Sequence, residues 1–329
     1  MAGLPWATEE EANAQALDWE QFHERWPGRT WEGWRYKKRM IRQGKVMVQS
    51  VMPDVDRPDP VKLLKASIAM QKELDKLYSN CNDAAVFIDT NRPVAIVFLS
   101  DAHIGEGGTD IQRLADDVET IAGHEQLYVY LGGDMAHNFI LSVMAHFGTM
   151  DDQIMPPQAQ WTLLRHFVKQ LQPSIVAMGV GNHDWWTRRQ VGIDKVQEIA
   201  DEYRLVYTGH GGLLRLQIGE MIYPIYRRHK YRYNSSFNLT HTVKRMLEQG
   251  PVDFDIGVVE HGHVPAIEIF QRKGTRRIAI RTGTYLTASA FAAEVGLTWD
   301  YGTPVVVLHP DQHRMTPFGT IEEAMAYLG

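Results

Sequence analysis

Three apolar runs of this 329-residue chain each end in a group of Asp, His or Asn residues, and this pattern constrains the fold more than any other. The runs are residues 94–99 before Asp101 and His103, residues 127–131 before Asp134, and residues 174–180 before Asn182 and His183. Continuous apolar runs predict strands that are buried on both faces. Because parallel strands end at one edge of a sheet, we expect these polar side chains to meet there.

Three further apolar runs, residues 221–226, 255–259 and 277–280, alternate with helical stretches, and together the runs predict an α/β fold in which sheets are layered with helices. More histidines follow these runs at His229, His261 and His263. Carboxylate, amide and imidazole groups are ligands for divalent ions such as Mn, Fe and Zn. There are too many of them for one ion, so we expect two. Two ions about 3.5–4 Å apart activate a bridging water as hydroxide and hold a phosphoryl group for attack.

The order of these motifs resembles that of the calcineurin-like metallophosphoesterases, whose motifs are DxH, GD, GNH(D/E), a lone His and GHxH. In this chain the corresponding residues are Asp101-Ala102-His103, Gly133-Asp134, Gly181-Asn182-His183-Asp184, His229 and Glu260-His261-Gly262-His263. The resemblance covers residues 93–310. It implies a four-layer α/β/β/α sandwich and a metal-dependent phosphoester hydrolase. No strong serine or cysteine nucleophile competes with this reading, since the one cysteine is Cys81.

Carried over position by position, the resemblance assigns the two metal ions. It puts Asp101, His103 and His263 on one ion, Asn182, His229 and His261 on the other, and Asp134 between them as a bridge. His183 would approach the phosphate, where it stabilises the transition state or protonates the leaving oxygen. We expect manganese, with iron, zinc, nickel and cobalt as alternatives.

The chain departs from the family pattern at two positions. Glu260 stands where the last motif has glycine, which affects a turn but removes no ligand. His137 stands three residues after Asp134, where many phosphomonoesterases of the family have Asp. Gly-Asp-x-x-His resembles the DNA-repair nuclease branch, in which that histidine supports the His of the GNH motif. We therefore expect His137 to orient His183, and we favour phosphodiester substrates.

Side chains near the predicted site are basic or aromatic. The basic ones are Arg188, Arg189, Arg227, Arg228, Lys230 and Arg232. They suit a polyanionic substrate, although ordinary surface charge explains each of them equally well. Trp185 and Trp186 can stack a base, but we expect at least one of them in the core.

The N-terminal region has a different character. Residues 1–24 carry no Lys or Arg, whereas residues 25–45 are strongly basic. We expect a helix from a capping box at Thr8 to about Trp26, then a second helix capped by Thr30. The second helix would carry a basic stripe of Arg35, Lys38, Arg39 and Arg42. The pair loosely resembles Myb/homeodomain-like helix-turn-helix modules that bind DNA, and a solvated basic helix is the equal alternative.

These observations divide the chain into a helical module at residues 1–48, a linker and connecting helix at 49–92, and the phosphoesterase domain at 93–329.

The net charge of −6 shows that the chain as a whole is no polycation made to coat nucleic acid. No apolar run is long enough to cross a bilayer and no signal peptide is evident, so we expect a cytoplasmic protein.

The function expected is a phosphodiesterase or nuclease that acts on nucleic acid or nucleotides. Two alternatives remain open. One is a phosphomonoesterase that acts on phosphoprotein or small esters. The other is a DNA-binding protein whose phosphoesterase domain is inactive, against which the complete ligand set argues.

Overall fold

The computed structural model describes residues 6–43, 59–79, 83–140, 153–250, 252–287 and 300–329. Most of the predicted linker and Cys81 lie outside these residues. The chain divides into two compact units, Met1–Ile68 and Ala69–Gly329. Helix α4 (Pro60–Ser79) spans the boundary between them. Among the described residues, no helix is long and apolar enough to cross a membrane.

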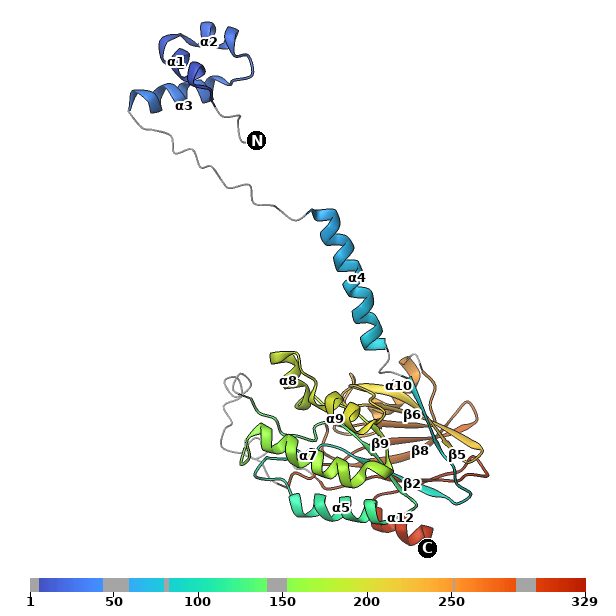
Figure 1. Ribbon diagram of the computed structural model, residues 1–329. Helices are drawn as coiled ribbons and strands as arrows, with labels where there is room; N and C mark the ends of the chain where they lie inside the picture. Colours follow the sequence, from blue (N-terminus) through green and yellow to red (C-terminus); the bar gives the residue numbers. More distant parts are fainter. Residues whose placement is uncertain (1–5, 44–58, 80–82, 141–152, 251, 288–299) are drawn as a thin grey trace. The chain divides into compact units, whose positions relative to one another are not determined.

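The larger unit contains two β-sheets (Figure 1). The five-stranded sheet has the order β11 (Met315–Phe318), β10 (Val305–Leu308), β2 (Val94–Leu99), β3 (Leu127–Leu131) and β4 (Ile175–Met178). The six-stranded sheet has the order β1 (Asp83–Ile88), β5 (Gly211–Ile218), β6 (Met221–Arg228), β7 (Ile256–Val259), β9 (Thr275–Arg281) and β8 (Ala266–Arg272). Strands β2, β3 and β4 are parallel, as are β6, β7 and β9. Each sheet therefore gathers several carboxyl ends at one edge.

Apolar side chains of the two sheets pack against each other in a shared core. Ile96 and Phe98 of β2 face this core together with Tyr223 and Ile225 of β6. Alternate residues of β2, such as Val97, point the opposite way, toward the helices. Strand β2 is thus buried on both faces, which explains its uninterrupted apolar sequence.

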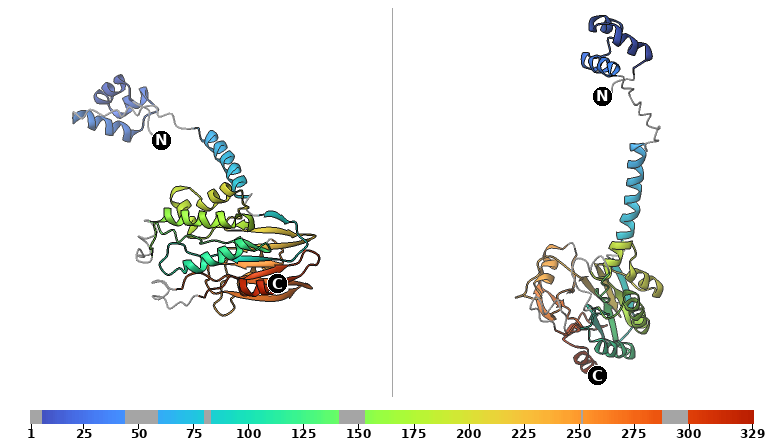
Figure 2. Two further views of the ribbon diagram at one scale, coloured as in Figure 1. Left: turned by 60° about the horizontal axis from the view of Figure 1, so that its bottom comes forward. Right: turned by 90° about the vertical axis from the view of Figure 1, so that its left-hand side faces the viewer.

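Helices cover the outer face of each sheet. Over the five-stranded sheet lie α5 (Ile111–Gly123), α7 (Pro157–Leu171), α9 (Lys195–Tyr203) and α12 (Ile321–Leu328), whose apolar residues join one core with β2 and β3 (Figure 1). Over the six-stranded sheet lies α10 (His241–Gln249), which packs with Phe254 and residues of β5, β6, β7 and β9. Figure 2 shows the layers from two other sides. The predicted four-layer α/β/β/α architecture is confirmed.

The sequence located the central strands better than those near the sheet edges. The strands predicted at residues 94–99 and 127–131 have those bounds in the structure. Strands β1, β5, β8, β10 and β11 were not predicted. Arg215 and Gln217 interrupt the apolar pattern of β5, because they point away from the core, and β8 is a half-exposed edge strand. Strand β1 pairs with β5, so the sheet begins inside the segment predicted as linker and connecting helix.

Ahead of α4, the described residues of the smaller unit form three helices where two were predicted, α1 (Thr8–Ala16), α2 (Trp19–Arg25) and α3 (Trp31–Arg42). The predicted first helix is broken before Asp18, whose carboxylate caps α2 by accepting from the Gln21 N–H. The cap of α1 is Ala7 instead of Thr8, and the Glu10 carboxylate accepts the Ala7 N–H. Thr30 caps α3 as predicted.

The basic stripe of α3 is narrower than predicted. Lys38 turns back into the unit, where its Nζ donates to the carbonyl oxygen of Leu17 at 2.8 Å and lies over the Trp34 ring. The side chains of Arg35, Arg39 and Arg42 are exposed. The outward-facing stripe therefore consists of these three arginines.

Gly257 gives a test of the contact between α10 and the six-stranded sheet. A methyl group there would come within 2.3 Å of Val243 Cγ1 on α10 and 2.5 Å of the Phe254 ring. We expect Gly257→Ala to lower the free energy of unfolding by about 1–3 kcal/mol, because the packed layers leave no room. Gly123→Ala, with no atom within 4 Å of the added methyl, is the control and should cause no loss. Urea unfolding followed by circular dichroism measures both, and equal midpoints would contradict the packing described.

Candidate metal centre

The polar side chains predicted from the strand ends do converge at one edge. Backbone hydrogen bonds join the loops that follow β2 and β3, among them those from Asp101 N–H to the Gly133 carbonyl at 2.9 Å and from His103 N–H to the Asp134 carbonyl at 3.0 Å. The His261 N–H lies 3.2 Å from Asp101 Oδ1, which brings in the loop after β7. Loops from both sheets therefore build one site.

The backbone at this edge is strained. Five non-glycine residues of the site have positive φ angles, namely Asp101 (51°), His103 (48°), Asp134 (54°), His261 (67°) and His263 (55°). Each such residue costs of the order of 1 kcal/mol or more, so a group of them persists only where the surroundings impose it. Glu260 is not among them, and the glycine position of the last motif therefore needs no left-handed backbone here.

Asp101, His103 and His263 form the first cluster. One potential ligand atom of each residue lies within 4.8 Å of the others. His263 Nε2 is 3.3 Å from Asp101 Oδ1 and 3.2 Å from His103 Nε2. Burial and the neighbouring histidines hold the pKa of His103 well below its usual value, so this imidazole is neutral and has a lone pair for a metal ion.

Asp134, His229 and His261 form the second cluster by the same criterion. His229 Nε2 lies 3.1 Å from Asp134 Oδ2 and 3.1 Å from Asn182 Oδ1. Burial raises the pKa of Asp134, but His229 and His183 outweigh it and hold that pKa well below its usual value. Asp101 also lies within 4.8 Å of His229 and Glu260, so the two clusters adjoin.

The residues of the second cluster fit a cation. Asp134 Oδ2 and His261 Nδ1 are 3.9 Å apart, and both are buried. Neither atom has a well-directed hydrogen bond within the described part of the chain. Asp134 Oδ2 lies within ion-pairing distance of the His229 ring, whereas His261 Nδ1 is buried without a hydrogen-bond partner among these residues, and an ion bound by both atoms would satisfy them. Mixed N and O donors of this kind suit Mn, Fe or Zn.

His183 lies beside both clusters. Its Nδ1 is 2.9 Å from the carbonyl oxygen of His137, and because that oxygen only accepts, Nδ1 carries the proton. Burial lowers the pKa of His183 to about 4, so the ring is neutral at pH 7. The Trp186 ring covers it at a centroid distance of 4.0 Å.

His137 contacts His183 through its backbone. The hydrogen bond from His183 Nδ1 is accepted by the His137 carbonyl oxygen. The His137 imidazole instead lies 3.1 Å from Glu106 Oε2 and stacks on Phe139 at 4.3 Å. Its ring still lies 5.5 Å from that of His183, so both histidines border the same space.

Two buried carboxylates that received no predicted role hold the site together. Asp184 accepts the backbone N–H groups of Asp134 (2.7 Å), Gly181 (2.9 Å) and Ala136 (3.2 Å), which joins the loops after β3 and β4. Burial and nearby Asp134 raise the pKa of Asp184 to about 7. Glu106 is the other. Asp184 sits inside a motif that the sequence displays, but no sequence signal marks Glu106.

Several of the basic and aromatic side chains predicted near the site have other partners. Arg227 is fully buried and ion-pairs with Glu260, so it faces no substrate. Arg188 pairs with Asp194 at 3.2 Å and lies over Trp185, which packs against the core. Trp186 is the tryptophan that lies at the site, against His183 and Phe139.

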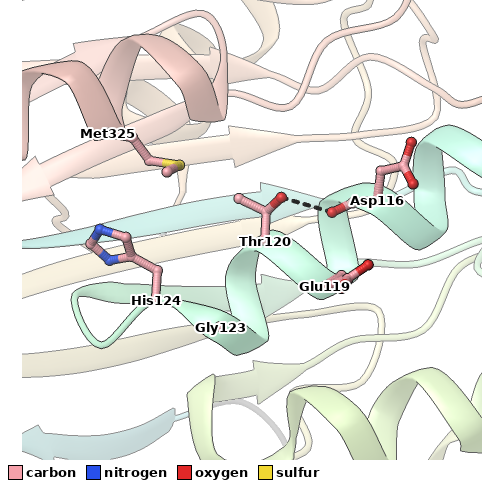
Figure 3. A pocket seen from close by; sticks show the side chains of 6 residues that line it. All are labelled: Asp116, Glu119, Thr120, Gly123, His124 and Met325. Atoms are coloured by element: carbon pink, nitrogen blue, oxygen red, sulfur yellow. Dashed lines mark hydrogen bonds between the residues drawn. The ribbon is translucent and has the colours of Figure 1, made fainter.

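A surface pocket elsewhere does not belong to this site (Figure 3). It is lined by Asp116, Glu119, Thr120, Gly123, His124 and Met325, from α5, the residue that follows it and α12. Gly123 and His124 come just before β3 begins, whereas the site residues follow the ends of the strands. The pocket is therefore at the opposite edge of the sheet.

No protein-family model and no curated protein matches the chain. Solved structures do match. A predicted phosphoesterase of Streptococcus pneumoniae is 14% identical over 70% of this chain and 99% of its own, with a TM-score of 0.33. A metallophosphoesterase of Sphaerobacter thermophilus is 15% identical over 69% and 88%, with a TM-score of 0.33. Vps29 of Entamoeba histolytica, as a double mutant, is 10% identical over 69% and 98%, with a TM-score of 0.32. At these identities and TM-scores, none of the three indicates what this chain binds or hydrolyses.

Metal addition tests the centre. A ligand that binds only the folded state adds about 2.7 kcal/mol to its stability when the free ligand concentration is 100 times Kd. Mn²⁺ at such a concentration should therefore raise the unfolding temperature by several degrees. Asp134→Asn should lose most of this shift, whereas His166→Ala, at an exposed position of α7, should keep it.

The rise in unfolding temperature that Mn²⁺ causes should also depend on pH. Burial lowers the pKa of His229, but the Asp134 and Glu260 carboxylates raise it well above its usual value. A metal ion therefore has to displace a proton from His229, and the Mn²⁺-induced shift should shrink as pH falls. A shift that is equal in the Asp134→Asn variant or independent of pH would contradict the assignment.

Proposed function

We propose that this chain is a phosphoester hydrolase that works with two divalent metal ions, manganese being the first candidate, and that its substrates are phosphodiesters of nucleic acid or nucleotides. The observation that carries the proposal is the pair of adjoining Asp/His clusters at the strand ends. One ion would be held by Asp101, His103 and His263, and the other by Asn182, His229 and His261, with Asp134 shared. Such ions supply Lewis acidity that activates water and neutralises charge on the phosphoryl group.

His183 is the candidate catalytic residue. Its Nδ1–H is engaged by the His137 carbonyl, which leaves Nε2 for the substrate. A phosphate anion beside the His183 ring stabilises the protonated imidazolium form, because the two opposite charges attract each other. Protonated at Nε2, His183 hydrogen-bonds a phosphoryl oxygen or gives the proton to the leaving oxygen as the P–O bond breaks. The overall reaction consumes one water and yields a phosphomonoester and an alcohol.

Aromatic side chains beside His183 support a diester with a planar leaving group. Trp186 is half-buried and packs against both His183 and Phe139. If His183 protonates the leaving oxygen, the group attached to that oxygen lies on the same side as these rings. Stacking on an aromatic ring contributes about 1–3 kcal/mol per base. The Gly-Asp-x-x-His sequence that includes His137 favours the same substrate class.

The alternative hydrolase is a phosphomonoesterase. The alternative of another class is a nucleic-acid-binding protein with an inactive domain. The inactive-domain alternative is disfavoured because every predicted ligand position is filled by a residue that can bind a metal.

Parallel hydrolysis assays distinguish these functions. We expect the metal-stripped protein titrated with Mn²⁺ to hydrolyse bis(para-nitrophenyl) phosphate faster than para-nitrophenyl phosphate. His183→Ala should lower turnover by about 100-fold or more, as loss of acid catalysis does, with metal content unchanged. Faster hydrolysis of the monoester would favour the phosphatase, and no activity on either would favour the binding protein.

The N-terminal unit supports a nucleic-acid partner through one specific feature. Arg35, Arg39 and Arg42 are exposed along α3 and have no acidic partner within 4 Å among the described residues. Trp31 and Tyr36 lie beside two of them and are 43% and 50% exposed. Arginines that alternate with exposed aromatic rings suit phosphate contacts and base stacking.

Replacing all three arginines with glutamine should weaken binding to duplex DNA. The slope of log affinity against log salt should fall by about 0.9 for each phosphate group that the variant no longer neutralises. The control replaces Lys62, Lys65 and Lys72, which are exposed on α4, with glutamine and so removes the same charge elsewhere. Binding that falls equally in both triple variants would reflect net charge alone and would refute a specific role for α3.

A further inference from the structure

A buried ion pair lies directly behind the second metal cluster. Arg227 Nε donates to Glu260 Oε1 at 2.7 Å, and Arg227 Nη2 also contacts Glu260 Oε2. The two side chains are 0% and 2% exposed. Glu260 occupies the position at which the family that the sequence resembles has glycine.

The surrounding backbone leaves room for the pair. A methyl group on Gly179 would lie 2.1 Å from Arg227 Nη1, and one on Gly132 would lie 2.3 Å from Glu260 Oε1. Neither glycine has a positive φ angle. Space for Arg227 and Glu260, and not backbone conformation, therefore explains why glycine is needed at the ends of β3 and β4.

The remaining polar atoms of the pair are well satisfied. Arg227 Nη1 donates to the Gly209 carbonyl at 2.8 Å, and the Gly133 N–H donates to Glu260 Oε2 at 2.9 Å. Even so, a buried ion pair adds little net stability, since the cost of taking two charges out of water offsets much of their attraction. The contacts within the pair alone do not explain why the chain keeps it.

The contact that connects the pair to the site is with His229. Glu260 Oε2 lies 3.0 Å from His229 Nδ1. Glu260 already accepts from the Arg227 guanidinium and from the Gly133 N–H, so its carboxylate faces His229 as a hydrogen-bond acceptor. Nδ1 is therefore the protonated nitrogen, and Nε2 is directed at Asp134 Oδ2 and Asn182 Oδ1, each 3.1 Å away.

We propose that Glu260 is a positioning residue, held by Arg227, which fixes the protonation and the ring orientation of His229 so that Nε2 is presented to a divalent cation. This inference rests on the proposed function, because it assumes that His229 binds a metal. A carboxylate behind a ligating histidine typically contributes 10- to 100-fold to metal affinity.

The test has to separate this role from the charge balance between Arg227 and Glu260. Removing Glu260 alone would leave a buried, unpaired arginine and destabilise the fold. Two double variants avoid this. In Arg227→Met/Glu260→Gln, the amide oxygen still accepts from Gly133 N–H and His229 Nδ1–H. In Arg227→Met/Glu260→Met, the side chain has nearly the same size but lacks that acceptor.

Mn²⁺ binding to all three proteins is measured by titration calorimetry. We expect one of the two sites to weaken 10- to 100-fold in the Met/Met variant and to stay close to wild type in the Met/Gln variant. Equal affinity in the two double variants would overturn the proposal, since Glu260 would then serve only to balance Arg227.

Nitrogen-15 NMR of His229 gives a reading that needs neither turnover nor metal. Wild type should show an Nδ1 proton protected from exchange, both without metal and with Zn²⁺, and the Met/Met variant should lose the protection. An unprotonated Nδ1 in wild type would refute the proposal even if the double variants fail to fold. Wild type that binds no divalent metal, but has a protected Nδ1 proton, would instead refute the proposed function.

Discussion

The site depends on carboxylates that are removed from water at the meeting edge of two sheets. Asp101, Asp134 and Glu260 are each almost fully buried. Burial by itself favours the neutral forms of Asp134 and Glu260. Imidazoles and Arg227 oppose that tendency by lying within hydrogen-bonding distance. The loops around them carry the strain that this arrangement requires. Buried charges this close together are stable only when oppositely charged or hydrogen-bonding groups lie beside them. The residues around these carboxylates supply such groups.

The layered core provides the rigidity for this arrangement. Strand β2 packs against the other sheet with one face and against helices with the other, so the loop that carries Asp101 and His103 starts from a fixed position. Strands β3 and β4 extend the same parallel sheet. Asp184 then joins the ends of these two strands through three backbone amides. Strained loops keep one conformation here because the strands that support them cannot shift.

The two units place their charged side chains differently. In the larger unit, the charged groups at the strand ends are buried and paired, as Arg227 is with Glu260. The smaller unit exposes Arg35, Arg39 and Arg42 to solvent and keeps Lys37 and Lys38 for its own packing, through Glu11 and the Leu17 carbonyl. Net charge alone does not reveal this division, because the exposed basic face of α3 belongs to a chain that is acidic in total.

The sequence by itself determined the α/β class, the central strands and the residues that gather at their ends. It could do so because apolar periodicity and the order of the polar motifs are local properties of the chain. The tertiary structure alone decided which groups pair across long sequence distances. Glu260 with Arg227, Asp184 with the loop after β3, and Glu106 with His137 meet only when the layers pack. The inward turn of Lys38 likewise follows from its contact with the Leu17 carbonyl of another segment. The break before Asp18 is local, because the Asp18 carboxylate caps α2 through the Gln21 N–H.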